Sequence, residues 1–131
     1  MSSHTMHDAR LLADAQRVAD AVLAGLEGHG VVVVATIDGF DLAEAGSRPV
    51  NRVRLSAMVS SIAALGDAAS VETGIGATRC LVVESSEGRL VVRCMQSHGQ
   101  AVVVVVLTDR SVLLGLVWNQ LASAERLLLV A

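Results

Sequence analysis

Residues 53–71 have the periodicity of a single helix with two separate apolar faces. One face, here called the large seam, consists of Leu55, Met58, Ile62, Leu65 and Ala69. The other face, the small seam, consists of Val53, Ala57, Ser60, Ala64, Ala68 and Val71. A helix that covers one core needs only one apolar stripe. We therefore expect the large seam to cover the protein's own core, and the small seam to contact the same helix of a second copy.

The alternative is that the small seam is an ordinary solvated face, because alanine and serine are tolerated on exposed helices. Two observations favour contact with another surface. Val53 and Val71 lie at the two ends of the seam, and Asp67 is its only charged residue.

The apolar content also favours a partner. The chain has 131 residues, enough for one domain, and 53% of them are hydrophobic, above the share of about 45–50% that is usual for such domains. The longest apolar run covers residues 101–107, far short of the roughly 18 residues that a membrane span needs. Because residues 1–10 are polar and do not resemble a signal peptide, we expect a cytoplasmic protein without membrane insertion. Residues 1–9 are expected to be a disordered tail, and 10–131 a single domain.

Charge and aromatic content exclude several functions. The net charge is −3, all ten basic residues are arginines, and the only aromatic residues are Phe40 and Trp118. Nucleic-acid binding therefore has little support. Without lysine, neither a phosphate-binding loop ending in Gly-Lys-Ser/Thr nor a Schiff-base lysine is present. This composition is typical of GC-rich bacterial genomes.

The order of elements predicts an α/β sandwich. Helices are expected at residues 10–28, at 53–71 with Asn51 as N-cap, and after Thr108, Asp109 or Ser111. Strands are expected at residues 31–37, 40–45, 78–84, 89–95 and 101–107, the first two joined by an Asp38-Gly39 turn. The order α-β-β-α-β-β-β-α predicts a five-stranded antiparallel sheet with helices on both faces. Apolar spacing gives the last helix a buried side of Leu113, Leu116, Val117, Leu121, Ala124 and Leu128.

Three segments in this order resemble the Roadblock/LC7 family. They are residues 33–43 at the first hairpin, 54–61 in the middle helix and 104–116 where the last strand meets the last helix. The resemblance covers roughly residues 23–127 and implies a profilin-like fold. It further implies a homodimer in which the middle helices pair and the third strands, with Arg79, Leu81 and Val83, meet edge to edge.

The resemblance implies that the protein is a non-enzymatic, bacterial regulator or scaffold of a small Ras-like GTPase, and that it needs no cofactor. The alternative is a small-molecule-sensing module of similar architecture. That function requires convergent polar groups in an apolar cavity, and the strands offer almost none.

Catalytic and metal-binding chemistry has little support in the sequence. His4 and His7 fall in the tail, and His29 and His98 stand beside glycines at turns, so we expect surface histidines rather than ligands. A three-residue turn at 86–88 would place Cys80 opposite Cys94. Without a signal peptide, we expect both to be reduced thiols.

The start of the middle helix is rich in arginine. Arg48, Arg52 and Arg54 gather at the start of the middle helix, where the helix dipole disfavours cations. They form either a docking patch for an acidic GTPase surface or a solvated cluster without function. Gly115 is expected to permit close approach of the last helix to the sheet.

Overall fold

The computed structural model describes residues 9–46 and 48–129. Its elements are α1 (Ala9–Gly25), β1 (Val31–Thr36), β2 (Asp41–Gly46), α2 (Arg52–Glu72), β3 (Cys80–Glu84), β4 (Gly88–Ser97), β5 (Gln100–Asp109) and α3 (Leu114–Leu129). The predicted order of elements is confirmed. Ala9 belongs to α1 rather than to a tail, and the other residues assigned to the tail lie outside the described part of the chain.

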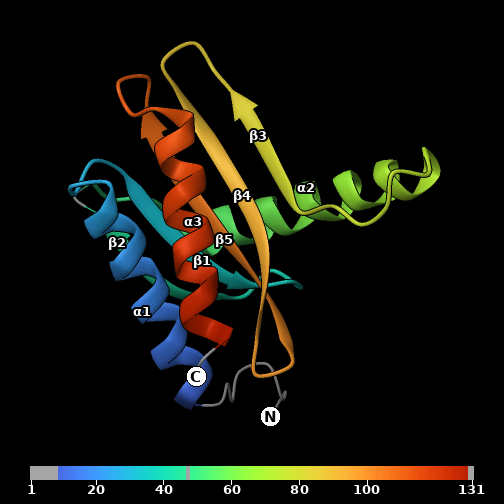
Figure 1. Ribbon diagram of the computed structural model, residues 1–131, viewed down its shortest axis with the longest axis horizontal. Coiled ribbons are helices and arrows are strands. Elements are labelled where there is room, and N and C mark those ends of the chain that lie inside the picture. Colours follow the sequence, from blue (N-terminus) through green and yellow to red (C-terminus); the bar gives the residue numbers. More distant parts are fainter. Residues whose placement is uncertain (1–8, 47, 130–131) are drawn as a thin grey trace.

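The sheet is antiparallel throughout, with strand order β2-β1-β5-β4-β3 (Figure 1). All six residues of β1 are buried, and so is the central run of valines in β5. This agrees with their continuous apolar sequence, which is typical of strands covered on both faces. The edge strands are β2 and β3.

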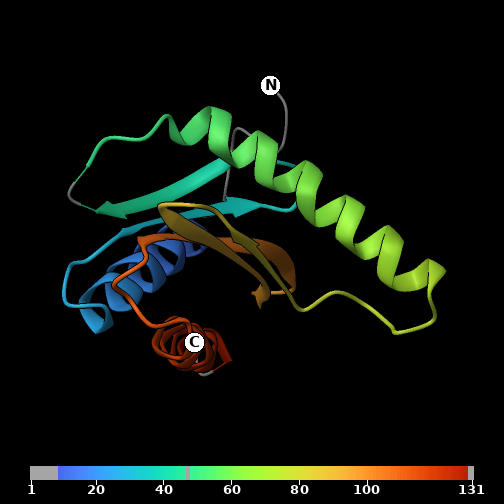
Figure 2. The ribbon, with the colours of Figure 1, turned by 90° about the horizontal axis from the view of Figure 1, so that it is seen from above.

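Helices α1 and α3 cover one face of the sheet (Figures 1 and 2). Helix α1 buries Leu11, Ala15, Val18 and Val22. Four of the six buried positions predicted for the last helix are confirmed in α3: Val117, Leu121, Ala124 and Leu128. The prediction is wrong for Leu113 and Leu116, which are 75% and 39% exposed. Asp109 binds Ser111 within the preceding turn, so α3 begins only at Leu114. A Cβ on Gly115 would meet nothing within 4 Å, so the expected close approach there is also wrong.

Helix α2 crosses the opposite face of the sheet. Asn51 caps it as predicted, its side chain accepting a hydrogen bond from the Arg54 amide at 3.1 Å. The residues that α2 buries are Ser56, Val59 and Ala63. The expectation that the large seam covers the core is wrong for Met58, Leu65 and Ala69. Met58 and Leu65 are 56% and 72% exposed, and Ala69 is exposed as well. The buried stripe lies between the two seams, because small residues there let the helix approach the sheet closely.

The C-terminal half of α2 extends beyond β3 (Figure 2). Helix α2 has 21 residues, which at 1.5 Å per residue make it roughly 31 Å long. Five strands spaced about 4.8 Å apart span only about 19 Å. We call residues 65–79 the arm: the last turns of α2 and the segment that returns to β3. Within it, the Thr78 amide donates to the Asp67 carboxylate at 3.1 Å, and the hydroxyls of Thr78 and Ser70 lie 3.0 Å apart.

The cysteines do not face each other. Cys80 pairs with Arg93, and Leu81 with Val92, one residue out of the predicted register. The Ser85 amide donates to the Gly88 carbonyl at 2.9 Å, so the turn has one residue fewer at its tip than the predicted turn at 86–88. A slip of one residue moves side chains to the other face of a sheet. Cys80 therefore lies on the α3 side, where Arg93 binds Glu125 at 2.6 Å. Cys94 lies on the α2 side, and both are free thiols.

No described helix combines the length and apolarity needed to cross a membrane.

Stability at alkaline pH should report on these two thiols. Burial raises the pKa of Cys80 and of Cys94 above the ordinary value of 9.0. A folded-state pKa above the unfolded one means that stability is complete below pH 9 and falls as the pH rises through the folded-state values. The chain has no lysine or tyrosine, so few other groups titrate there. The free energy of unfolding, measured with urea under reducing conditions, should fall between pH 8.5 and pH 11. The double variant Cys80→Ala/Cys94→Ala should lose most of this dependence, and an unchanged slope would contradict the assignment.

Candidate self-association and docking surface

The small seam lies on the flank of α2 that faces the β1–β2 turn. The Ser60 hydroxyl donates to the Ile37 carbonyl at 2.6 Å. Gly39, with φ of 98°, lies so close that a Cβ would be 3.4 Å from the Ala57 Cα. Ser60 is half-buried, and the rest of the seam is exposed, as is Asp67: Val53, Ala57, Ala64, Ala68 and Val71.

The large seam lies on the opposite flank and faces the end of the sheet where β1 begins. Leu55 packs against the sheet on this side, in the cluster that also includes Leu90 and Leu107. Met58 and Leu65 are mostly exposed. Large apolar side chains gathered on one exposed surface mark contact sites more often than solvated faces. Both flanks of α2, and not only the small seam, are therefore candidates for contact.

An open groove of about 610 Å³ lies beside the large seam, on the part of the sheet that α2 leaves uncovered. Val83, Leu90 and Leu107 supply its apolar surface. Its walls come from the β3–β4 turn, from Arg48 in the β2–α2 loop, and from the residues before β1: Gly28, His29 and Gly30. We call this the sheet groove. Leu55 of the large seam packs in the same cluster as Leu90 and Leu107 of the groove, so the large seam and the sheet groove are neighbours.

Strand β3 borders this surface and forms an edge of the sheet. It has five residues and pairs only with residues 89–93 of β4. Arg79 precedes it and is exposed, Leu81 packs beneath Gly66 of α2, and Val83 is 41% exposed. An edge strand presents backbone groups that can pair with another strand, so β3 can extend the sheet into a second molecule.

The three arginines have three different environments. Arg52 binds Asp41 at 2.6 Å and Glu44 at 3.8 Å, so it holds α2 to β2. Arg48 lines the sheet groove, and Arg54 is exposed near the start of α2. Sequence spacing alone could not separate these roles, because the carboxylates that bind Arg52 lie on a different element.

A cavity between α1 and the sheet is too small for a ligand. Its volume is about 10 Å³, and its lining is almost entirely apolar. Small-molecule sites usually have about 300–1,000 Å³, whereas this volume is about that of one water molecule.

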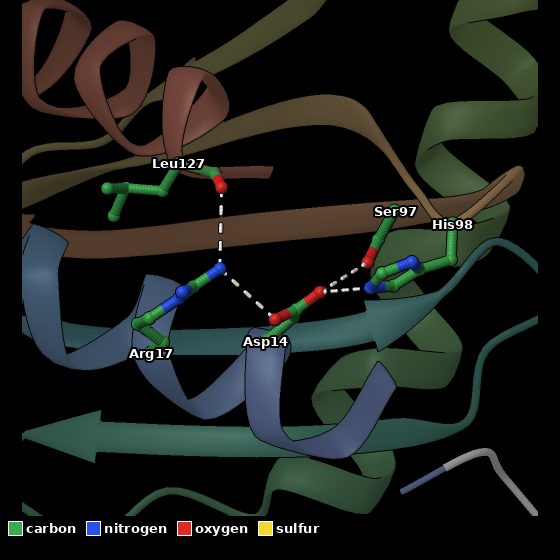
Figure 3. A network of polar contacts seen from close by, with 5 residues as sticks. All are labelled: Asp14, Arg17, Ser97, His98 and Leu127. Carbon is green, nitrogen blue, oxygen red and sulfur yellow. Dashed lines mark hydrogen bonds and ion pairs between the residues drawn. The ribbon is translucent and has the colours of Figure 1, made fainter. Parts of the chain in front are cut away.

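A polar network links α1, the β4–β5 turn and α3 (Figure 3). The buried Asp14 carboxylate lies 2.6 Å from His98 Nε2, 3.1 Å from Arg17 Nη2 and 3.4 Å from the Ser97 hydroxyl. Arg17 also donates to the Leu127 carbonyl at 3.3 Å. His98 occupies the predicted turn, but sequence analysis missed its contact with Asp14, which is 84 residues away.

The arrangement does not suit nucleophilic catalysis, because the buried Ser97 hydroxyl contacts the carboxylate rather than the imidazole. The network instead ties the β4–β5 turn to both helices. Among residues 9–46 and 48–129, no three metal-ligating side chains gather at one place.

Comparison with solved structures identifies the fold. No protein-family model matches the sequence, and no curated protein matches it. MglB of Myxococcus xanthus superimposes with a TM-score of 0.79 at 18% identity, over 92% of this chain and 87% of MglB. A Roadblock/LC7 domain from Streptomyces avermitilis gives 0.73 at 21% identity, over 85% and 91%. The chain has the Roadblock/LC7 fold. Profilin IB of Acanthamoeba castellanii gives 0.59 at 14% identity, over 87% and 96%, so the Roadblock/LC7 fold here is also profilin-like, as expected.

Charge reversal should destabilise the protein at Arg52, which is held in ion pairs, but not at Arg54, which is exposed. Arg52→Glu places a third carboxylate beside Asp41 and Glu44 and should lower the free energy of unfolding by about 1 kcal/mol. In Arg54→Glu the new carboxylate has no such neighbours, and a negative charge near the start of a helix is favoured by the helix dipole. The free energy of unfolding should therefore stay within about 0.5 kcal/mol of the parent value or rise slightly. Urea unfolding of both variants measures the difference. Equal effects would show that the Arg52 ion pairs contribute nothing.

Proposed function

We propose that this protein is a homodimeric, non-enzymatic interaction protein that binds and regulates a small Ras-like GTPase. The observation that carries the self-association is the projecting arm beside an open edge strand. Leu65 and Ile75 on the arm are 72% and 78% exposed. Covering such residues is favourable by about 25 cal/mol for each Å² of apolar surface removed from water.

A two-fold axis at the outer edge of β3 accounts for this surface. Antiparallel pairing of β3 with its counterpart joins the two sheets, and Arg79, Leu81 and Val83 lie at that junction. Strand β3 runs from beneath α2 at Leu81 to the sheet groove at Val83. An axis at the outer edge of β3 therefore places the partner's α2 on the groove side, alongside the large seam.

This arrangement makes the large seam the main helix-to-helix contact. Met58 and Leu65 of one copy meet their counterparts, and α2 of each copy covers the uncovered sheet of the other. The small seam, which the sequence suggested for self-contact, stays exposed on the other flank beside Ile37 of the β1–β2 turn, itself 46% exposed. We assign the small seam to docking of the GTPase.

The Roadblock/LC7 fold, together with the sequence resemblance, supports a GTPase as the partner. Arg54 is exposed on α2 and is available to an acidic surface, whereas Arg52 is already held by β2. Such a regulator contributes by positioning its partner's switch loops rather than by chemistry of its own. We propose that the protein acts in the cytoplasm.

A matched pair of substitutions on α2 tests the self-association. Leu65→Glu puts a charge on the large seam and should convert the dimer to a monomer. Ala64→Glu puts the same charge on the small seam, one residue away, and should leave the dimer intact. Both positions are exposed, so the fold should survive, which circular dichroism can check. Sedimentation measures the outcome. A monomeric Ala64→Glu together with a dimeric Leu65→Glu would show that the copies meet through the small seam instead.

The same pair tests the docking surface. The probe is a small Ras-like GTPase encoded in the same genome, loaded with GDP or with a non-hydrolysable GTP analogue and measured by interferometry. Ala64→Glu should weaken binding at least tenfold although the dimer persists. Arg54→Glu should weaken binding more at low salt than at high salt, because its contribution is electrostatic. Failure of the parent protein to bind in either nucleotide state would overturn the proposed partner.

A further inference from the structure

We infer that the tip of the arm, centred on Ile75, inserts into the sheet groove of the second copy. This inference rests on the proposed homodimer and assigns an occupant to the groove. It makes the contact between copies reciprocal, since each copy supplies one tip and one groove, as a two-fold interface requires.

The tip, Gly74-Ile75-Gly76, presents an apolar side chain on an ordered backbone. Ile75 is 78% exposed, yet its amide donates to the Ser70 carbonyl at 3.0 Å. The flanking Gly74 and Gly76 have φ of 74° and 93°, a backbone that glycine adopts without strain. The Gly74 amide also donates to the Val71 carbonyl at 3.1 Å, which closes the end of α2. Because its backbone is already ordered, Ile75 loses little conformational entropy on insertion.

The length of the arm matches the position of the groove. Gly66 lies over Leu81 of the same chain's β3. The six residues from Gly66 to Glu72 add about 9 Å of helix, which is about two strand spacings. Across a β3–β3 junction, two spacings lead past the partner's β3 to its β4. Leu90 of β4, Val83 of β3 and Leu107 of β5 form the apolar surface of the groove at that place.

Charge also matches. The last turn of α2 contains Glu72, has no basic residue, and carries the negative end of the helix dipole. The groove wall contains Arg48, for which the described residues supply no ion-pair partner. Two other charges of the wall are already engaged, because Arg89 binds Glu84 and Asp109 binds Ser111. Glu87, at the turn, is the remaining acidic residue of the wall.

Disulfide trapping between two different chains tests the inference. Ile75→Cys on one chain is mixed with His29→Cys or Glu87→Cys on another, so that the two walls of the groove are sampled separately. Both chains carry Cys80→Ala and Cys94→Ala, and a size tag on one identifies the mixed dimer. Asn119→Cys is the control, because Asn119 is exposed on α3 at the opposite face of the sheet.

Mild oxidation should link Ile75→Cys to at least one groove cysteine, and at least tenfold more than to Asn119→Cys. A dimer by sedimentation that gives no groove link above the control overturns the inference and leaves the proposed homodimer standing. A cysteine-free parent that sediments as a folded monomer, when the native sequence does the same, overturns the homodimer and the inference together. Should only the cysteine-free parent be monomeric, Cys80→Ser/Cys94→Ser replaces it and the same two outcomes apply.

Discussion

The close packing of α2 against half of one sheet face is the constraint on which the rest of the structure depends. Small side chains at Ser56 and Ala63, with Val59 between them, bring the helix axis near the strands. A helix packed this closely buries only a narrow stripe, so the large seam and the small seam lie on the two sides of the helix rather than against the sheet. Because α2 is also longer than the sheet is wide, its last turns project beyond β3 (Figure 2). The exposed arm, the open edge and the sheet groove all follow from this placement.

The two faces of the sheet consequently differ in what they offer to a partner. On one face, α1 and α3 close the core, and the contacts of Asp14 with His98 and of Arg17 with the Leu127 carbonyl tie α1 to the β4–β5 turn and to α3. On the other face, α2 leaves the sheet groove uncovered beside β3. In the proposed homodimer, α2 of the second copy completes this layer and covers apolar surface of a chain with 53% hydrophobic residues.

Local pattern was sufficient for the elements and insufficient for the relations between them. The valine-rich strands β1 and β5, the Asn51 cap and helix α1 were predicted correctly, because each depends on neighbours within a few residues. Cys80 and Cys94 were placed opposite each other wrongly, since the β3–β4 turn has one residue fewer than predicted and this puts the two cysteines on opposite faces. The roles of the three arginines could not be separated either, because Asp41 and Glu44, which bind Arg52, lie on a different element, strand β2.

The sequence by itself determined the order of the elements, the antiparallel sheet and the presence of two apolar seams on one helix, because hydrophobic periodicity and turn residues act over short distances. Only the tertiary structure decided which stripe of α2 is buried. That choice depends on the rotation of the helix about its axis, which is set by side-chain volumes at the sheet rather than by the spacing of apolar residues. It moved Met58 and Leu65 from the expected core to an exposed flank, and so placed the candidate contact surface beside the groove and the edge strand.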